Sequence, residues 1–323
     1  MSPTLVQSVE QRLNLRAYGG TIEDVKSLKP STLDTPLEEL RRRFNEYGVL
    51  WAELVNRDLV NKCRRDYLEF VNHGSGMLKP GTDPEEGIFS GNDWRNFILP
   101  GGTRLALGLE DEGPFVENAV KSHVAPFYLD FKDGIAKQME AFSTPVLYDQ
   151  IFLRAGPPTS VSAWVPIGDI EKDGGGLMYL DHSHDIGKKY EEDFPRLNME
   201  LSDKEKVSHV NRNMNAGGWL DRNSSQLGKT WGRDWLVGEY EAGDVVFHNP
   251  YMIHAGPMNE SSKGRIRVST DLGSLYISLD SAECEDGRPL RAFFAIDLVL
   301  AISYHGSKIY VRTSRTRYML FYC

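Results

Sequence analysis

The sequence predicts an α+β, mainly β protein in which a β-barrel or jelly roll carries helices on its outside. In the first half of the chain, apolar residues recur at the three- and four-residue spacing of amphipathic helices. From Pro145 onward the pattern changes to short apolar runs, rich in β-branched and aromatic residues and bounded by Gly or Pro. A helical half followed by closely spaced short strands is typical of this fold class.

The helical half contains three amphipathic stretches, which we interpret as scaffold. They are predicted over Thr35–Tyr47, Leu54–Val71 and Pro114–Phe142. For the first, Thr35 is expected to be the N-cap, with Pro36 in the first turn and Glu38 completing a capping box. Residues 81–102 are rich in Gly, Pro, Asp and Asn and predict a loop.

The second half contains six short runs with the composition of strands. They cover Val146–Leu153, Val161–Ile167, Gly176–Leu180, Asp244–His248, Met252–Ala255 and Arg265–Thr270. A polar segment over about 187–236 separates the third run from the fourth and is expected to be irregular. Its Trp219, Trp231 and Trp235 form either a lid over a substrate or a small core of their own.

Composition excludes several classes of function. The chain has 323 residues, and 37 Lys and Arg face 46 Asp and Glu, so its net charge of −9 argues against nucleic-acid binding. Three scattered cysteines indicate a reducing compartment. The N-terminus lacks the pattern of a secretory signal, and the apolar stretch Phe293–Ile302 is too short to cross a bilayer. We therefore expect a cytoplasmic protein with no membrane partner.

The segment from Gly243 to Arg267 carries the most chemical information. Its Gly243-Asp244 turn starts a strand, His254 lies on a short continuation, and Arg265 opens the next strand after a loop. Imidazole is a suitable ligand for Fe(II), and an arginine fork suits a carboxylate. The two side chains are expected to point into one cavity, although a strand histidine can equally be a hydrogen-bonded core residue.

Three blocks together resemble the phytanoyl-CoA dioxygenase family. They are Ser160–Ile170, Gly174–Leu180 with Ser183-His184, and Gly243–Arg267. The resemblance extends over about 35–272 and is strongest from Tyr148 onward. It implies a double-stranded β-helix, the cupin-like jelly roll of non-haem Fe(II)- and 2-oxoglutarate-dependent oxygenases.

The resemblance also implies roles for individual residues. His254 corresponds to the distal iron ligand, and Arg265, eleven positions later, to the arginine that binds the distal carboxylate of 2-oxoglutarate. Trp164 corresponds to an aromatic residue lining the co-substrate pocket. His184 matches a recurrent histidine with a structural role, and Asn259 is expected to fix the loop after the ligand.

The family's other two iron ligands, a His-x-Asp or His-x-Glu pair, are missing. None of the eight histidines is followed two positions later by an acid. The lead-in Leu153–Pro158 joins directly to Thr159–Trp164, so a strand of about 15–20 residues is absent, which would leave two new sheet edges. His182 and His184 with His254 form a conceivable replacement set, and His248 also lies near His254.

The domain organisation follows from these limits. We expect an N-terminal extension over 1–33, a single domain over 34–272, and a divergent tail over 273–323. Within the domain, a helical half over about 34–145 precedes a jelly-roll half over about 146–272. A skipped exon and a translated intron would explain both the missing strand and the tail.

The expected function is that of a 2-oxoglutarate-dependent dioxygenase hydroxylating a small organic substrate, impaired because two of three iron ligands are missing. Whether the chain is an enzyme is left open. One alternative is a non-catalytic jelly-roll binding protein, and the other is a mis-spliced, unproductive product. The substrate is not defined by the sequence, and neither is the oligomeric state.

Overall fold

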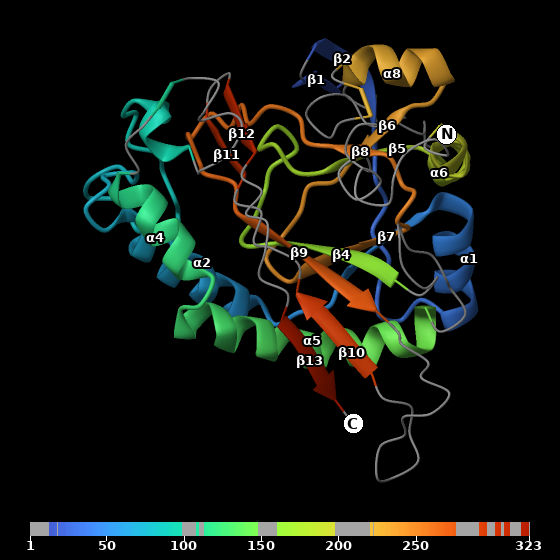
Figure 1. Ribbon diagram of the computed structural model, residues 1–323, viewed down its shortest axis with the longest axis horizontal. Helices are drawn as coiled ribbons and strands as arrows, with labels where there is room; N and C mark the ends of the chain where they lie inside the picture. The colour runs from blue at the N-terminus through green and yellow to red at the C-terminus, as the bar shows by residue number, and fades with distance from the viewer. Residues whose placement is uncertain are drawn as a thin grey trace, which may run out of the picture.

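The structure is a computed structural model (Figure 1). It describes residues 13–17, 19–98, 108–109, 113–147, 160–197, 220–221, 223–275, 291–295, 301–304, 307–310 and 318–322. Its described helices include α1 (Leu37–Tyr47), α2 (Arg57–Asn72), the 3₁₀ turn η1 (Trp94–Phe97), α4 (Pro114–Ser122), α5 (Pro126–Leu147), α6 (His184–Leu197) and α8 (Ser224–Trp231).

Two β-sheets form the centre of the molecule. The larger has the order β13-β10-β9-β4-β7-β3, with strands at Tyr318–Tyr322, Arg291–Ala295, Ser269–Leu275, Ser160–Pro166, Asp244–His248 and Val49–Glu53. The smaller has the order β1-β2-β6-β5-β8, with strands at Leu13–Ala17, Gly20–Ser27, Trp235–Val237, Met178–Leu180 and His254–Ala255. A separate hairpin pairs β11 (Ala301–Tyr304) with β12 (Ser307–Tyr310).

The larger sheet lies between a helical layer and the smaller sheet, as Figure 1 shows with α2 and α5 on one side. Strand β4 shows how the larger sheet contacts both layers, because its side chains alternate between the two faces of the sheet. Ala163 and Val165 pack in the cluster shared with the helices, whereas Trp164 packs in the cluster between the sheets with Tyr179 of β5. This is the jelly-roll core with flanking helices that the sequence predicts.

The predicted helices exist with corrected ends. Helix α1 begins at Leu37 without a side-chain cap, because the Thr35 hydroxyl accepts from the Thr32 amide instead. Helix α2 begins at Arg57, and its N-cap Asn56 accepts from the Leu59 amide at 2.9 Å. The long helix predicted over 114–142 is two helices, α4 and α5, which are interrupted at 123–125 before Pro126.

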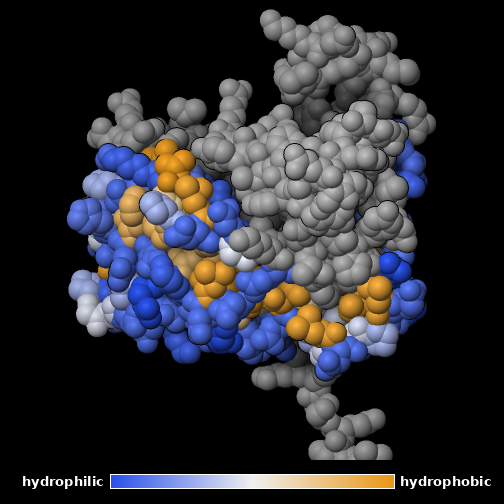
Figure 2. All heavy atoms as spheres, turned by 90° about the horizontal axis from the view of Figure 1, so that it is seen from below, coloured by the Kyte–Doolittle hydropathy of each residue, from blue (hydrophilic) through white to orange (hydrophobic). Residues whose placement is uncertain are grey.

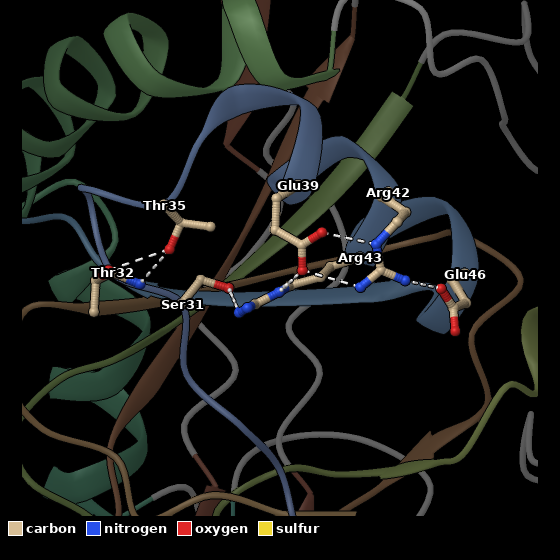
Figure 3. A network of polar contacts seen from close by, with 7 residues as sticks. All are labelled: Ser31, Thr32, Thr35, Glu39, Arg42, Arg43 and Glu46. Atoms are coloured by element: carbon tan, nitrogen blue, oxygen red, sulfur yellow. Dashed lines mark hydrogen bonds and ion pairs between the residues drawn. The ribbon is translucent and has the colours of Figure 1, made fainter.

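Charged side chains connect α1 to the segment before β3 (Figure 3). Glu39 accepts from Arg42 at 2.7 and 2.9 Å and from Arg43 at 2.8 Å, and Arg42 also contacts Glu46. These hydrogen bonds lower the pKa of Glu39 to about 2. Arg43 donates in addition to the Ser31 hydroxyl at 3.1 Å, which fixes α1 against the segment that bridges to β3.

Several strand expectations need correction. Residues 146–147 end α5, because the helix continues past the predicted change of period, and 148–153 lie outside the described residues. The strand predicted from Arg265 begins at Ser269, since residues 265–268 follow the loop and form only a bridge to Ile88. It continues past 272 to Leu275, and β10 and β13 from the predicted tail extend the same sheet.

The polar segment and the N-terminus are more regular than expected. The segment over 187–236 contains most of α6, all of α8 and the start of β6, and residues 198–219 lie outside the described part. Residues 13–27, expected in an extension, form β1 and β2 at the edge of the smaller sheet. Alternating apolar residues explain this, since Leu15, Ala17 and Ile22 pack against Trp235 in one core cluster.

The surface seen in Figure 2 is mainly hydrophilic and is interrupted by apolar patches. Large apolar side chains are exposed at Leu33, Leu37, Val120, Val124 and Leu129. No helix of the described residues is long and apolar enough to span a bilayer.

Candidate functional site

Two histidines from opposite sheets meet between them. His248 is the last residue of β7 in the larger sheet, and His254 is the first residue of β8 in the smaller sheet. Their ring centroids are 4.9 Å apart. His248 is only 4% exposed, whereas His254 is exposed. The pair therefore combines a buried imidazole with one that solvent can reach.

Backbone contacts orient both rings. Nδ1 of His254 lies 2.9 Å from the Met252 carbonyl and donates to it, which leaves Nε2 for another partner. His248 has a hydrogen bond to the backbone of Val246, and its Nδ1 lies 3.5 Å from the Tyr179 hydroxyl. Burial, with the charge of His254, lowers the pKa of His248 well below its usual value, so its imidazole is neutral.

An acid faces the same space. Asp271 in β9 lies opposite Trp164 of β4 in the sheet register. Burial raises the pKa of Asp271, and the charges of His254 and Arg267 oppose that rise. Sequence reasoning missed Asp271; the signal was the two-residue period of β9, which places Ser269 and Asp271 on one face.

The iron implied by the family resemblance does not fit the residues present. A facial triad needs two histidines and a carboxylate. Within the described part of the chain, no three His, Cys, Asp or Glu side chains come together closely enough to hold a metal ion. The sequence also contains no His-x-Asp or His-x-Glu pair. The rings of His248 and His254 meet, but among the described residues no carboxylate lies close enough to complete a triad with them.

Arg265 lies in a different pocket from His254. Asp169, Ile170, Glu171, Gly174, Ser261, Ile266 and Arg267 line this small pocket with it. It has room for about one water molecule, so it can admit only one end of a ligand. Within the described residues, Nε of Arg265 and Oγ of Ser261 are buried there without a hydrogen-bond partner. His254 does not line this pocket, so the structure separates the two predicted residues.

Asn259 closes the loop that leads to Arg265. Its amide donates to the Arg265 carbonyl at 2.7 Å, and its Oδ1 accepts from the Ser261 amide at 3.0 Å. The residue after Arg265 is also held, since Nη2 of Arg64 donates to the Ile266 carbonyl at 2.9 Å. Both contacts hold the backbone on either side of Arg265.

The other predicted site residues lie at separate places. Trp164 is buried between the sheets, where its ring lies edge-on to Tyr240 with centroids 4.8 Å apart. His184 starts α6 and packs against Gly48, where a Cβ would lie 2.6 Å from its Nδ1. His182 has φ of 49° and pairs with Asp181 at 2.7 Å. The structure joins neither His182 nor His184 to His254 in a metal group of described residues.

The tryptophans of the polar segment pack in a small core. Trp235 is 3% exposed and donates from Nε1 to the Ser224 carbonyl at 3.0 Å. Trp231 packs against the same cluster, which also contains Leu15 and Ile22. Trp219 lies outside the described residues. For Trp231 and Trp235, the structure favours the core over the lid.

The fold and these residues define a jelly-roll protein with a histidine pair between its sheets. The family model described as phytanoyl-CoA dioxygenase (PhyH) matches residues 129–267, a little under half of the chain. The match over that segment confirms the resemblance to this family. It supports a dioxygenase-like function. No curated protein matches the chain.

Distant likenesses to solved structures accompany this match. The non-heme alpha ketoglutarate dependent epimerase SnoN from nogalamycin biosynthesis is 13% identical, with 78% of this chain and 94% of that chain covered and a TM-score of 0.35. The carbocyclase SnoK from the same biosynthesis is 15% identical, with 76% and 86% covered and a TM-score of 0.37. The function is therefore argued from the chain's own residues.

Proposed function

We propose that this chain binds 2-oxoglutarate through Arg265 and is an impaired member of the 2-oxoglutarate-dependent dioxygenases, whose substrate is a small organic molecule. The observation that carries the proposal is the buried Nε of Arg265, which has no acceptor among the described residues. A buried donor without a partner costs about 1–3 kcal/mol, and a carboxylate would satisfy it with a charge-assisted hydrogen bond. Arg265 also follows His254 by eleven residues, as the family resemblance requires.

The surroundings support the binding of one carboxylate end. Ser261 offers a hydroxyl in the same pocket, and the Asn259 contacts hold the loop in place. The lining acids Asp169 and Glu171 are engaged by Arg57 and Lys263 respectively. Those ion pairs reduce the repulsion that a bound carboxylate would meet.

Impairment follows from the ligand count. The family's reaction needs iron held by three protein ligands, and the sequence lacks two of them. What this chain's residues can still do is bind one carboxylate end of the co-substrate and orient it through the Arg265 fork. We therefore derive no oxygenation step for this chain.

Calorimetry with 2-oxoglutarate, without metal, tests the binding. We expect the wild type to bind it and Arg265→Gln to weaken binding by at least about tenfold, since a charge-assisted contact is lost. Arg95→Gln is the matched control, because it removes a surface arginine that pairs with Asp93 and does not line the pocket. Equal affinity of wild type and Arg265→Gln would refute the role of Arg265.

Succinate release with added Fe(II) and 2-oxoglutarate tests the impairment. We expect release at the background of a protein-free reaction. Succinate release above this background that disappears in His254→Asn would contradict the proposed impairment and establish a working dioxygenase. Binding without turnover is also the behaviour of the non-catalytic alternative, for which the retained Arg265 pocket is the favouring observation.

A further inference from the structure

We propose that Lys263 binds a second carboxylate beside the Arg265 pocket, so that the ligands of this site are short dicarboxylates, with or without a keto group. The inference rests on the proposed function, because the first carboxylate must lie at Arg265. It assigns a ligand contact to a residue that does not line the pocket itself. It also names the feature of the ligand that the site recognises.

The pocket lies between two turns that the backbone holds together. The turns cover 171–174 and 261–264, and each is closed by a hydrogen bond from its last amide to its first carbonyl, at 2.8 and 2.9 Å respectively. The Glu260 amide donates to the Asp173 carbonyl at 2.7 Å, which joins one turn to the other. Both walls of the pocket are therefore in place before a ligand binds.

The inner part of the pocket has room for one carboxylate group. Ser261 is 4% exposed, and its Oγ, like Nε of Arg265, is buried without a hydrogen-bond partner among the described residues. The space holds about one water molecule, so the remainder of any longer ligand must extend out of it. A second charged group on the ligand would then meet the side chains at the edge of the pocket.

Two cations lie at this edge, and they differ in how fully they are engaged. Arg57 donates to both carboxylate oxygens of Asp169, at 2.9 and 3.0 Å, and to Glu241 at 2.7 Å. Lys263 is 67% exposed, and the contact that the described residues give its ammonium is with Glu171 at 3.3 Å. An ammonium has three donors, so Lys263 is the cation that can take a further carboxylate.

Glu171 brings Lys263 to the right place. Its side chain lines the pocket and is 39% exposed, so the ammonium that it holds lies beside the exit from the pocket. A surface ion pair of this kind contributes little to stability and exchanges partners readily. A ligand carboxylate can therefore replace Glu171 at Lys263, and the released Glu171 carboxylate can be hydrated.

The keto group of 2-oxoglutarate has no corresponding partner at this site. With the adjacent carboxylate it forms a chelating pair suited to a metal ion. Within the part of the chain that the structure describes, no group of His, Cys, Asp or Glu side chains could hold such an ion, and His254 does not line the pocket. We therefore expect glutarate, which lacks the keto group, to bind as 2-oxoglutarate does.

Calorimetry without metal, at fixed ionic strength, compares three ligands of equal chain length. They are 2-oxoglutarate, glutarate and pentanoate, and pentanoate has a single carboxylate. We expect the first two to bind with equal affinity and pentanoate to bind about threefold more weakly, as the loss of one exposed ion pair implies. The ratio of the glutarate affinity to the pentanoate affinity measures the second contact.

Two substitutions should change this ratio in opposite directions. Lys263→Gln should lower it to about one, because the second carboxylate loses its cation. Glu171→Gln should raise it, because Lys263 is then free of its competing partner. Lys121→Gln is the matched control, since it removes an exposed lysine that pairs with Glu117 on α4, and it should keep the wild-type ratio. A thermal melt of each variant verifies its folding.

The outcomes separate this inference from the proposed function. If 2-oxoglutarate binds through Arg265 but glutarate does not, the keto group is recognised, and the inference is wrong while the proposed function stands. A wild-type ratio in Lys263→Gln would likewise overturn the role of Lys263 alone. If no dicarboxylate binds, or if Arg265→Gln binds them as the wild type does, the proposed function fails as well.

Discussion

Arg64 donates from Nη1 to the Ile167 carbonyl and from Nη2 to the Ile266 carbonyl, both at 2.9 Å. It is fully buried in α2 and also donates to the carbonyls of Glu85 and Glu86. One guanidinium thus connects the helical layer to the end of β4 and to the residue after Arg265. All four of these acceptors are backbone carbonyls, so the role of Arg64 is to satisfy them.

Replacement of Arg64 should be severely destabilising. Arg64→Met would leave buried carbonyls without donors, and we expect the free energy of unfolding to fall by about 3–5 kcal/mol. Urea unfolding measures this change. The neighbouring Arg65 is about half exposed and pairs with Glu85, so Arg65→Met should cost less than about 1 kcal/mol. Similar losses for both variants would contradict the special role of Arg64.

The pH dependence of stability should carry a contribution from Asp244. Burial raises its pKa from 3.8 to about 6, although the Glu241 amide donates to it. The folded state therefore holds the proton more tightly than the unfolded state, and stability falls as pH rises from about 4 to 6. Two pKa units correspond to about 3 kcal/mol, an upper limit for the penalty above pH 6.

Asp244→Asn isolates this contribution, because its amide oxygen can still accept from Glu241. We expect the variant to be more stable than the wild type at pH 8, by up to about 3 kcal/mol, and equally stable at pH 4. Thermal or urea unfolding across this range measures the difference. A difference that is constant with pH would show that Asp244 is not the titrating group.

Much of the fold could be predicted because its patterns are local. The short apolar runs of β4 and β7 and the helical spacing of α1 and α2 are carried by contiguous residues. The ends of the helices were harder to predict. Thr35, for example, does not cap α1, because its hydroxyl accepts a hydrogen bond from the Thr32 amide instead. The regular structure of the polar segment depends on packing of Trp235 against β1 and β2, which are distant in sequence.

Only part of the site could be predicted, because local spacing is visible in a sequence and contacts between distant strands are not. His254 and Arg265 stand out through their spacing, which a single sequence records. Asp271 and Tyr179 approach His248 or His254 only through pairing of strands from different parts of the chain. The separation of Arg265 from His254 likewise depends on tertiary contacts, since Arg265 lies beside Asp169 and Glu171, which are distant in sequence.

Trp235 provides a test of core against lid. Trp235→Ala should lower the free energy of unfolding by about 3–5 kcal/mol, because a buried aromatic side chain is removed. It should leave the 2-oxoglutarate affinity unchanged, measured under conditions where the variant is folded. Trp235→Phe, which keeps most of the apolar area, should lose much less stability. An unchanged stability with altered ligand affinity would instead indicate a lid.

The edge of the smaller sheet bears on the missing strand. In the described residues, β8 pairs only with β5, so His254 lies on an edge strand of two residues. Loss of a strand beside it would create such an edge, and unpaired edges are prone to aggregation. The junction of Pro158 with Thr159 is where the sequence lacks that strand.

The messenger RNA should therefore contain an additional in-frame segment between the codons for Pro158 and Thr159. We expect it to be about 15–20 codons long, enough for a strand with its turn. We expect it to encode His-x-Asp or His-x-Glu, and sequencing of the messenger RNA decides the point. The longer chain should bind Fe(II) more tightly than this one, because it would add the two family ligands that this chain lacks beside His254. A transcript that reads directly from Pro158 to Thr159 would mean that the protein lacks the His-x-Asp or His-x-Glu pair and acts without it.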